Sequence, residues 1–311
     1  MQFLVKTQIT QTKSSARIAA AIAALVAAAA TAGAHADTIS IGNYTAIFQG
    51  ISEAGATVDG QFATVLQINL DAPGISFTTS PLCSGCTATA GANVVTKQTA
   101  AQFLTSTGAA VAITANTYIN NDGLPTPTSE SGLQVSNGTL VNPDQSGFGD
   151  LLISKNNQAT FATGGSVSSL AGVYNAIAGQ QGLILTSGTN TGSASSGAAD
   201  RAGVGLSQNG QFMYLVDVDN VSLNSEANLF SALGAFNAIN TDGGGSAELE
   251  VSNGKGGATN LNDSGTKDIG ADLGVFAAPL APVPLPAAVW LFGSGLLSLF
   301  GFGRRRFGLK E

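Results

Sequence analysis

The stretch Asn240-Thr241-Asp242-Gly243-Gly244-Gly245-Ser246 places three consecutive glycines directly after a carboxylate. It follows a short helical pattern and precedes residues 247–251, whose alternating polarity predicts a strand. Glycine permits positive φ and close approach of the backbone, so successive N–H groups of such a turn can point at one anion. An ordinary turn between two elements is the alternative interpretation, because Asp-Gly is a common turn dipeptide.

The patterns on either side of this stretch predict a single, strand-rich, mixed α+β domain with about three helices. Apolar alternation or continuous apolar runs predict strands at residues 63–70, 109–115, 182–185, 203–206, 212–218 and 273–277. Apolar residues at helical spacing predict helices at 96–107 and 168–178, and a third helix capped by Ser225. Residues 190–199 are rich in Gly, Ser and Thr, and we expect a mobile loop there.

Residues 1–36 have the three parts of a secretory signal peptide in the correct order. A basic segment precedes the apolar run 18–30, and Ala34-His35-Ala36 is a small-residue cleavage site. The mature chain would therefore begin at Asp37 in an exported protein. A disordered alanine-rich tail is the alternative interpretation of this segment.

The C-terminal residues 283–311 form a second targeting signal. Val283-Pro284-Leu285-Pro286-Ala287 leads into an apolar run that ends at Gly303, long enough for a transmembrane helix over 287–303. Three arginines at 304–306 would hold its end in the cytoplasm. This order resembles the PEP-CTERM (VPLPA-type) sorting signal of Gram-negative bacteria. The resemblance implies an inner-membrane intermediate, removal of the tail by an exosortase, and delivery to the cell surface or extracellular matrix. An ordinary tail anchor is the alternative.

The body between the two signals, residues 37–282, is strongly acidic. It contains five basic and 18 acidic residues, a formal charge of −13. Such a charge disfavours binding to a nucleic-acid backbone. The only histidine, His35, lies in the signal peptide, which excludes a Ser-His-Asp triad, a Cys-His pair and a histidine-ligated zinc from the body. No Asp-x-Asp-x-Asp calcium loop occurs, and we expect neither a metal nor a cofactor.

Cys83 and Cys86 are the only cysteines. Because an exported protein meets an oxidising compartment, this spacing favours a local structural disulfide. A redox site would require a helix N-terminus after a strand, and the flanking residues have the composition of a loop.

Several segments of the body occur in the order found in the phosphodiester glycosidase family. They are Val65–Asp71 (VLQINLD), Ala112–Tyr118 (AITANTY), Ala199–Gly205 (ADRAGVG), Leu215–Asn220 (LVDVDN) and Ala238–Ser246 (AINTDGGGS). The last is similar to the closing DGGGS signature of the family, and the resemblance extends over about residues 45–277. It implies hydrolysis of a sugar-1-phosphodiester, with envelope or extracellular polysaccharide as the expected substrate of an exported enzyme.

The chemistry of the residues agrees with this resemblance. Arg201, the only arginine of the body, is suited to bind a phosphate through two nitrogens. A carboxylate, Asp242 or Asp219, would stabilise or attack an oxocarbenium carbon or activate water. The expected substrate-binding residues are Asn116, Asn240, Gly243, Gly244, Gly245 and Ser246. A surface ion pair with Asp200 is the alternative for Arg201, and a turn position is the alternative for Asp219.

The sequence departs from the family pattern at three places. Thr117 and Tyr118 stand where the family has two glycines, and Ala247 stands where it has Ser or Thr. Lys267 occupies the position of a late arginine, and a lysine provides a point charge in place of a planar fork. These changes leave a second hypothesis open, a non-catalytic carbohydrate-binding or structural protein of the cell surface or matrix.

Overall fold

The computed structural model of the chain describes residues 37–86, 94–119, 127–262 and 267–281. From Ile39 onwards the described residues belong to one compact unit. The predicted signal peptide (1–36) and the predicted transmembrane helix (287–303) lie outside these ranges. Within them, no helix has the length and apolar character needed to cross a membrane.

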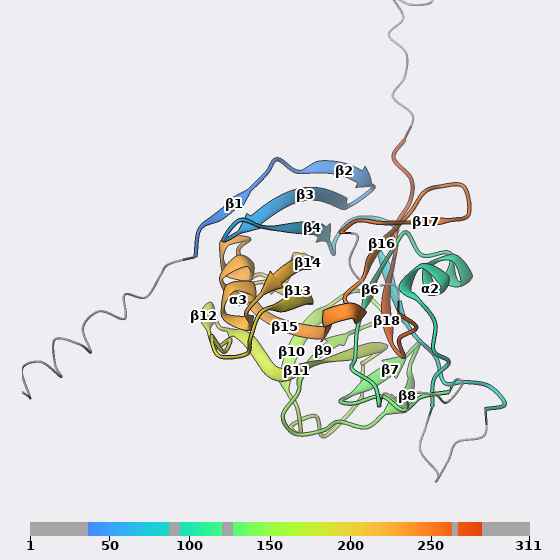
Figure 1. Ribbon diagram of the computed structural model, residues 1–311. Coiled ribbons are helices and arrows are strands. Elements are labelled where there is room, and N and C mark those ends of the chain that lie inside the picture. The colour runs from blue at the N-terminus through green and yellow to red at the C-terminus, as the bar shows by residue number, and fades with distance from the viewer. Residues whose placement is uncertain (1–36, 87–93, 120–126, 263–266, 282–311) are drawn as a thin grey trace, which may run out of the picture. The chain divides into compact units, whose positions relative to one another are not determined.

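Two antiparallel sheets form the body of the domain (Figure 1). The larger consists of β1 (Ile39–Ile41), β2 (Thr45–Phe48), β3 (Ile51–Val58), β4 (Gln61–Asn69), β7 (Gln134–Ser136), β8 (Thr139–Asn142), β9 (Gly149–Ile153), β10 (Ala159–Thr163), β11 (Asn175–Thr186), β12 (Thr189–Asn190), β13 (Ala199–Ser207), β14 (Phe212–Val221) and β15 (Ala235–Gly243). Its main path runs β1-β3-β4-β14-β13-β15-β11-β7-β8. The smaller sheet has the order β17-β16-β6-β18-β5, with β5 (Ser76–Thr79), β6 (Val111–Thr114), β16 (Leu249–Ser252), β17 (Ala258–Asn260) and β18 (Asp272–Phe276).

The main hydrophobic core lies between the two sheets. It joins buried residues of the larger sheet, such as Leu66 and Leu215, to buried residues of the smaller one, such as Ile113 and Leu273. Apolar side chains on both faces of the central strands account for the continuous apolar runs in the sequence. The predicted strands at 63–70, 109–115, 203–206, 212–218 and 273–277 are confirmed as β4, β6, β13, β14 and β18.

One helix covers the outer face of each sheet. Helix α3 (Leu223–Ala232) packs Leu229 and Phe230 on the larger sheet, and α2 (Ala100–Thr107) packs Phe103 and Leu104 beside the smaller one. A capping box formed by Thr99 and Gln102 begins α2. The predicted cap of α3 was three residues late, because Ser222 is the N-cap and its side chain accepts the N–H of Ser225.

The helix predicted at 168–178 is wrong. Residues 168–174 form no helix or strand, and Gly172 adopts a φ of 83°. From Asn175 the chain enters β11, the strand that also contains the predicted segment 182–185. Ile177 pairs with Leu151 of β9, so pairing with neighbouring strands prevails over the helical spacing of the apolar residues. The described residues therefore contain two α-helices and one 3₁₀ turn, where the sequence predicted about three helices.

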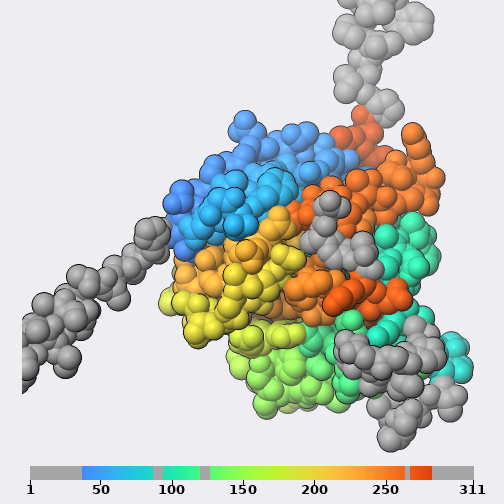
Figure 2. Space-filling view, viewed as in Figure 1, coloured from blue at the N-terminus to red at the C-terminus, as the bar shows by residue number. Residues whose placement is uncertain are grey.

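The glycine stretch connects the two sheets. Asn240 to Gly243 end β15, which lies between β11 and β13 of the larger sheet, so a strand precedes the glycines and not a helix. Residues Gly244–Ser246 form a 3₁₀ turn, and the chain then enters β16 of the smaller sheet. Gly244 has a φ of 61°, which glycine adopts without a steric penalty. In the space-filling view, this late part of the chain, in orange, lies between the early strands, in blue, and the middle of the chain, in green (Figure 2).

Candidate active site

Asp242 lies where β15 reaches the smaller sheet. Its N–H donates to the carbonyl of Ala115, directly after β6, at 2.8 Å. Its carboxylate accepts the N–H of Gly243 at 2.9 Å and a hydrogen bond from the Ser246 hydroxyl. These hydrogen bonds hold the carboxylate in place, and the residue is only partly buried, so solvent can still reach it.

The pKa of Asp242 suits acid–base or nucleophilic chemistry. Burial raises this pKa from 3.8 to about 6, while the hydrogen bonds from Gly243 and Ser246 and the charge of Lys267 act in the opposite direction. Catalytic carboxyl groups commonly titrate in this range, because their work requires a pKa near the operating pH.

Two cations flank the glycine turn. A Cβ placed on Gly245 would lie 3.2 Å from the Nζ of Lys267, so the lysine lies directly against the turn. On the other side, Arg201 and Gly243 occupy paired positions of β13 and β15. A Cβ placed on Gly243 would lie 3.9 Å from the Nη1 of Arg201. The turn thus passes between the body's only arginine and Lys267.

Arg201 is largely buried, with 9% of its surface exposed. Its Nε donates to the carbonyl of Val221 at 3.2 Å, and its Nη2 donates to the carbonyl of Gly197 at 3.0 Å. Its charge also acts on the fully buried Glu226 of α3, whose pKa burial raises well above the ordinary value and Arg201 lowers. Arg201 is therefore anchored by the protein itself, and only Nη1, on the side of Gly243, makes no hydrogen bond within the described residues.

Glu130 is a second carboxyl group near Asp242 that the sequence patterns did not single out. It is 4% exposed, and neither of its oxygens accepts a hydrogen bond from the described residues. Burial raises its pKa well above 4.5, the charges of Asp242 and Asp272 raise it further, and Lys97 lowers it. The segment around it is fixed by a bridge between Glu130 and Tyr118. The structure thus brings together two carboxyl groups in different environments, one partly exposed and one buried.

The two asparagines expected to bind sugar are buried and have structural positions. Asn116 donates to the carbonyls of Ser131 and Leu133, and its oxygen accepts the N–H of Ala178. Its amide is therefore fully used. Asn240 is 2% exposed in the middle of the larger sheet and donates to the carbonyl of Thr241. Neither side chain lies on the partly exposed surface around Asp242 and Gly244.

Asp219 lies at the same end of the larger sheet, on β14, next to the strand of Arg201. It accepts a hydrogen bond from Asn262 at 2.8 Å. Burial and the charge of Asp200 raise its pKa, and the bond from Asn262 lowers it. Asp219 is thus influenced by Asn262 and by the charge of Asp200, whereas Asp242 is influenced by Gly243, Ser246 and the charge of Lys267.

Two further features lie apart from this site. Cys83 and Cys86 are joined by a disulfide in a loop. A cavity of about 500 Å³ is lined by Leu70 and Asp71, by residues 156–160 and by residues 209–211. The turn 208–211 joins β13 and β14 at their end remote from Arg201, so this cavity does not include Asp242. Within the described residues, no group of three or more His, Cys, Asp or Glu side chains could hold a metal ion.

Comparison with known proteins identifies the family. Residues 107–276, more than half of the chain, match the phosphodiester glycosidase family. The chain belongs to this family. The matched region contains Glu130, Arg201, Asp242 and Lys267, and so all the residues that surround the glycine turn. Family membership points to a hydrolase that acts on a phosphodiester-linked sugar.

Solved structures share the fold at low identity. The catalytic domain of zebrafish N-acetylglucosamine-1-phosphodiester alpha-N-acetylglucosaminidase, auto-inhibited by its pro-peptide, has 15% identity and a TM-score of 0.54; the match covers 77% of this chain and 88% of that one. A hypothetical protein from Synechocystis has 16% identity and a TM-score of 0.53, over 78% of this chain. The match spans 64% of the Synechocystis protein. No curated protein matches the sequence.

Proposed function

We propose that this phosphodiester glycosidase hydrolyses the bond between the anomeric carbon of a sugar and a phosphodiester oxygen, in an envelope or extracellular polysaccharide. The observation that carries the proposal is the arrangement around the glycine turn. Asp242 begins the turn, Arg201 flanks it at Gly243, and Lys267 flanks it at Gly245. A strongly acidic body that gathers two of its few cations at one partly exposed turn is suited to an anionic ligand.

The proposed mechanism requires little acid catalysis. Cleavage of the sugar carbon–oxygen bond releases a phosphate monoester, which is already a stable anion. Lys267 and the free Nη1 of Arg201 would bind the phosphate, and the carboxylate of Asp242 would stabilise or attack the oxocarbenium carbon, or activate water. The oxygen of water ends on the sugar carbon and keeps one proton as the new hydroxyl. Its other proton passes to the medium or to the phosphate, and the phosphate leaves with the bonding electrons.

Glu130 would support this chemistry from within the protein. Since burial and neighbouring carboxylates raise its pKa, its neutral form is favoured. A neutral carboxyl group beside Asp242 does not repel an arriving phosphate, and it can donate a hydrogen bond. We therefore propose Glu130 as a positioning residue for Asp242 or for the substrate.

The cellular setting is also a proposal. The signal peptide predicted at 1–36 and the resemblance of 283–311 to a PEP-CTERM signal support export, an intermediate held in the inner membrane through residues 287–303, and processing by an exosortase. The product would reside at the cell surface or in the matrix, where polysaccharide phosphodiesters are accessible.

A non-catalytic carbohydrate-binding or structural role is the second candidate. The bulky Thr117 and Tyr118 and the replacement of an arginine by Lys267 favour it, because a catalytic site tolerates few changes near its ligand. A direct assay distinguishes the hydrolase from the non-catalytic role.

Purified protein is incubated with UDP-sugars and with sugar-1-phosphate methyl diesters, and free sugar is measured. Sugar release supports the hydrolase; binding of these compounds without turnover supports the second candidate.

Lys267 offers a test of the phosphate contact. We expect Lys267→Met to lower kcat/KM for a sugar phosphodiester about tenfold, because one charged contact to the phosphate is lost while Arg201 remains. Lys267→Arg should retain or exceed the wild-type value. Lys255→Met, which removes an exposed lysine in the β16–β17 turn, is the matched control and should change nothing. Equal rates for Lys267→Met and the wild type would remove Lys267 from the site.

A further inference from the structure

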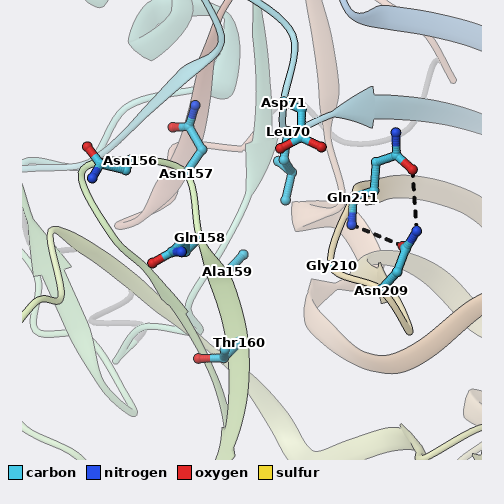
Figure 3. A pocket seen from close by; sticks show the side chains of 10 residues that line it. All are labelled: Leu70, Asp71, Asn156, Asn157, Gln158, Ala159, Thr160, Asn209, Gly210 and Gln211. Atoms are coloured by element: carbon cyan, nitrogen blue, oxygen red, sulfur yellow. Dashed lines mark hydrogen bonds between the residues drawn. The ribbon is translucent and has the colours of Figure 1, made fainter.

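The cavity of about 500 Å³ lined by residues 156–160 and 209–211 carries polar groups that the fold does not use. Asn156 and Gln158 each donate a backbone N–H to the hydroxyl of Ser154, and these bonds shape the turn 154–158. Their exposed side-chain amides make no hydrogen bond within the described residues, and the two residues lie on the side of the cavity opposite Gln211 (Figure 3). Asn157 and Asn209 differ from these two, because their amides are used within the protein. Asn157 donates to the carbonyl of Ile75, and Asn209 donates to the side-chain oxygen of Gln211.

A second hollow adjoins the first across the same turn. It has a volume of about 300 Å³ and shares Asn157 with the larger cavity. Tyr174 and Lys155 line it, and the Nζ of Lys155 lies 5.7 Å from the centre of the Tyr174 ring. The turn 154–158 therefore separates an amide-lined hollow from one that offers an aromatic ring.

This combination suits sugar units. A side-chain amide donates and accepts at once, as a sugar hydroxyl does, so free Asn and Gln amides match hydroxyl groups in either role. An aromatic ring provides a flat apolar surface with a polar tip beside them. Two adjoining hollows of this size admit neighbouring units of a chain.

Charge and strand geometry further restrict the chemical class of the ligand. Asp71 lines one hollow and Lys155 the other, so the region favours neither sign, and the formal charge of −13 on the body disfavours a polyanion. Among the described strands β10 pairs only with β9, so a peptide added to its free edge is the rival ligand. A peptide would require apolar pockets for alternate side chains, whereas most side chains that line the first hollow are amides, with one carboxylate.

We propose that the two hollows beside the turn 154–158 form a non-catalytic binding site for an uncharged stretch of a glycan chain. The site lies at the end of β13 and β14 remote from Arg201 and Gly243. It would hold a polysaccharide on the protein independently of what occurs at Asp242.

The test is affinity electrophoresis of the full-length chain in native gels that contain dextran, laminarin, glucomannan or, as an anionic polymer, alginate. We expect at least one neutral polymer to retard the wild type. The Asn156→Ala/Gln158→Ala double variant should bind that polymer about tenfold more weakly, because two hydrogen-bonding side chains are lost. Both side chains are exposed, so the variant should fold, which circular dichroism checks.

Two controls separate this site from the proposed catalytic site. Asn43→Ala removes an exposed amide in the β1–β2 connection, and Asp242→Asn alters the turn at the other end; both should bind like the wild type. The proposal is overturned if no neutral polymer retards the protein, if the double variant binds like the wild type, or if Asp242→Asn alone abolishes binding. Retardation by alginate alone, or saturable binding of an extended peptide instead of glycan, also overturns it.

Discussion

Asp242→Asn is expected to lower kcat for sugar release from a phosphodiester by roughly 100- to 10,000-fold. The amide has nearly the same shape as the carboxylate, so it keeps the bond to the N–H of Gly243 but loses the negative charge that faces the sugar carbon. Sugar release is followed by a coupled or chromatographic assay. Asp268→Asn, a change of the same kind at an exposed neighbouring position, should leave kcat unchanged, and full activity of Asp242→Asn would eliminate the proposed role.

The pH dependence of kcat/KM for the wild type should reflect the ionisation of Asp242. Because Asp242 acts in its ionised form and burial raises its pKa to about 6, kcat/KM should rise with pH through about 6 and level off above it. The Ser246 hydroxyl lowers this pKa, so Ser246→Ala should move the rising limb to higher pH. Activity that falls as pH rises through this range would mean that the neutral acid is the active form.

The second large effect concerns stability, which should fall as pH rises from 5 to 8. Burial, with Asp144 as a further cause, raises the pKa of Asp150 to about 7, and burial likewise raises that of Glu248 to about 7. A folded-state pKa above the unfolded value means that the folded protein binds more protons. The stability that each group contributes is therefore lost as pH rises from the unfolded pKa near 4 to the folded pKa. With allowance for partial solvation, ionisation of the two groups between pH 5 and pH 8 should lower the free energy of unfolding by about 3 kcal/mol. This corresponds to a decrease of roughly 6 to 12 °C in Tm.

Scanning calorimetry at pH 5 and pH 8 checks this expectation. The double variant Asp150→Asn/Glu248→Gln should flatten the dependence, because neither amide titrates. Glu130, Glu226 and Asp272 have pKa values that burial raises in the same direction, so a residual slope of the same sign should remain. A Tm that rises from pH 5 to pH 8 would show that these carboxyl groups are ionised and paired in the folded protein.

The central strands were predictable because their apolar residues are buried on both faces or alternate clearly, as in β4, β6 and β14. The helix predicted at 168–178 failed because residues 175–178 carry apolar side chains that serve a strand equally well, and only the pairing of β11 with β9 decides between them. The cap at Ser222 was missed since Ser225 is an equally good capping residue, and the geometry of the preceding turn selects between the two.

The residues of the candidate site likewise divide into those that the sequence predicts and those that it does not. Asp242, Gly243 and Arg201 were predicted from residue type and order; the structure places Arg201 beside Gly243, and their roles stay a prediction. Glu130 was not singled out because no sequence pattern marks it: it approaches Asp242 only when its segment pairs with the one around Tyr118 and Asp242 bonds to Ala115. Asn116 carried the right signal for a polar site residue, but its amide serves three backbone groups, a use that spacing alone does not predict.

Hydrolysis in ¹⁸O-labelled water tests the central claim most directly. If Asp242 acts at the anomeric carbon while Lys267 and Arg201 hold the departing phosphate, the sugar carbon–oxygen bond breaks. Mass spectrometry should then find the label in the hydroxyl of the released sugar and none in the phosphate monoester. Label in the phosphate would mean attack at phosphorus, a phosphodiesterase reaction, and would contradict the proposed role of Asp242 at the sugar carbon.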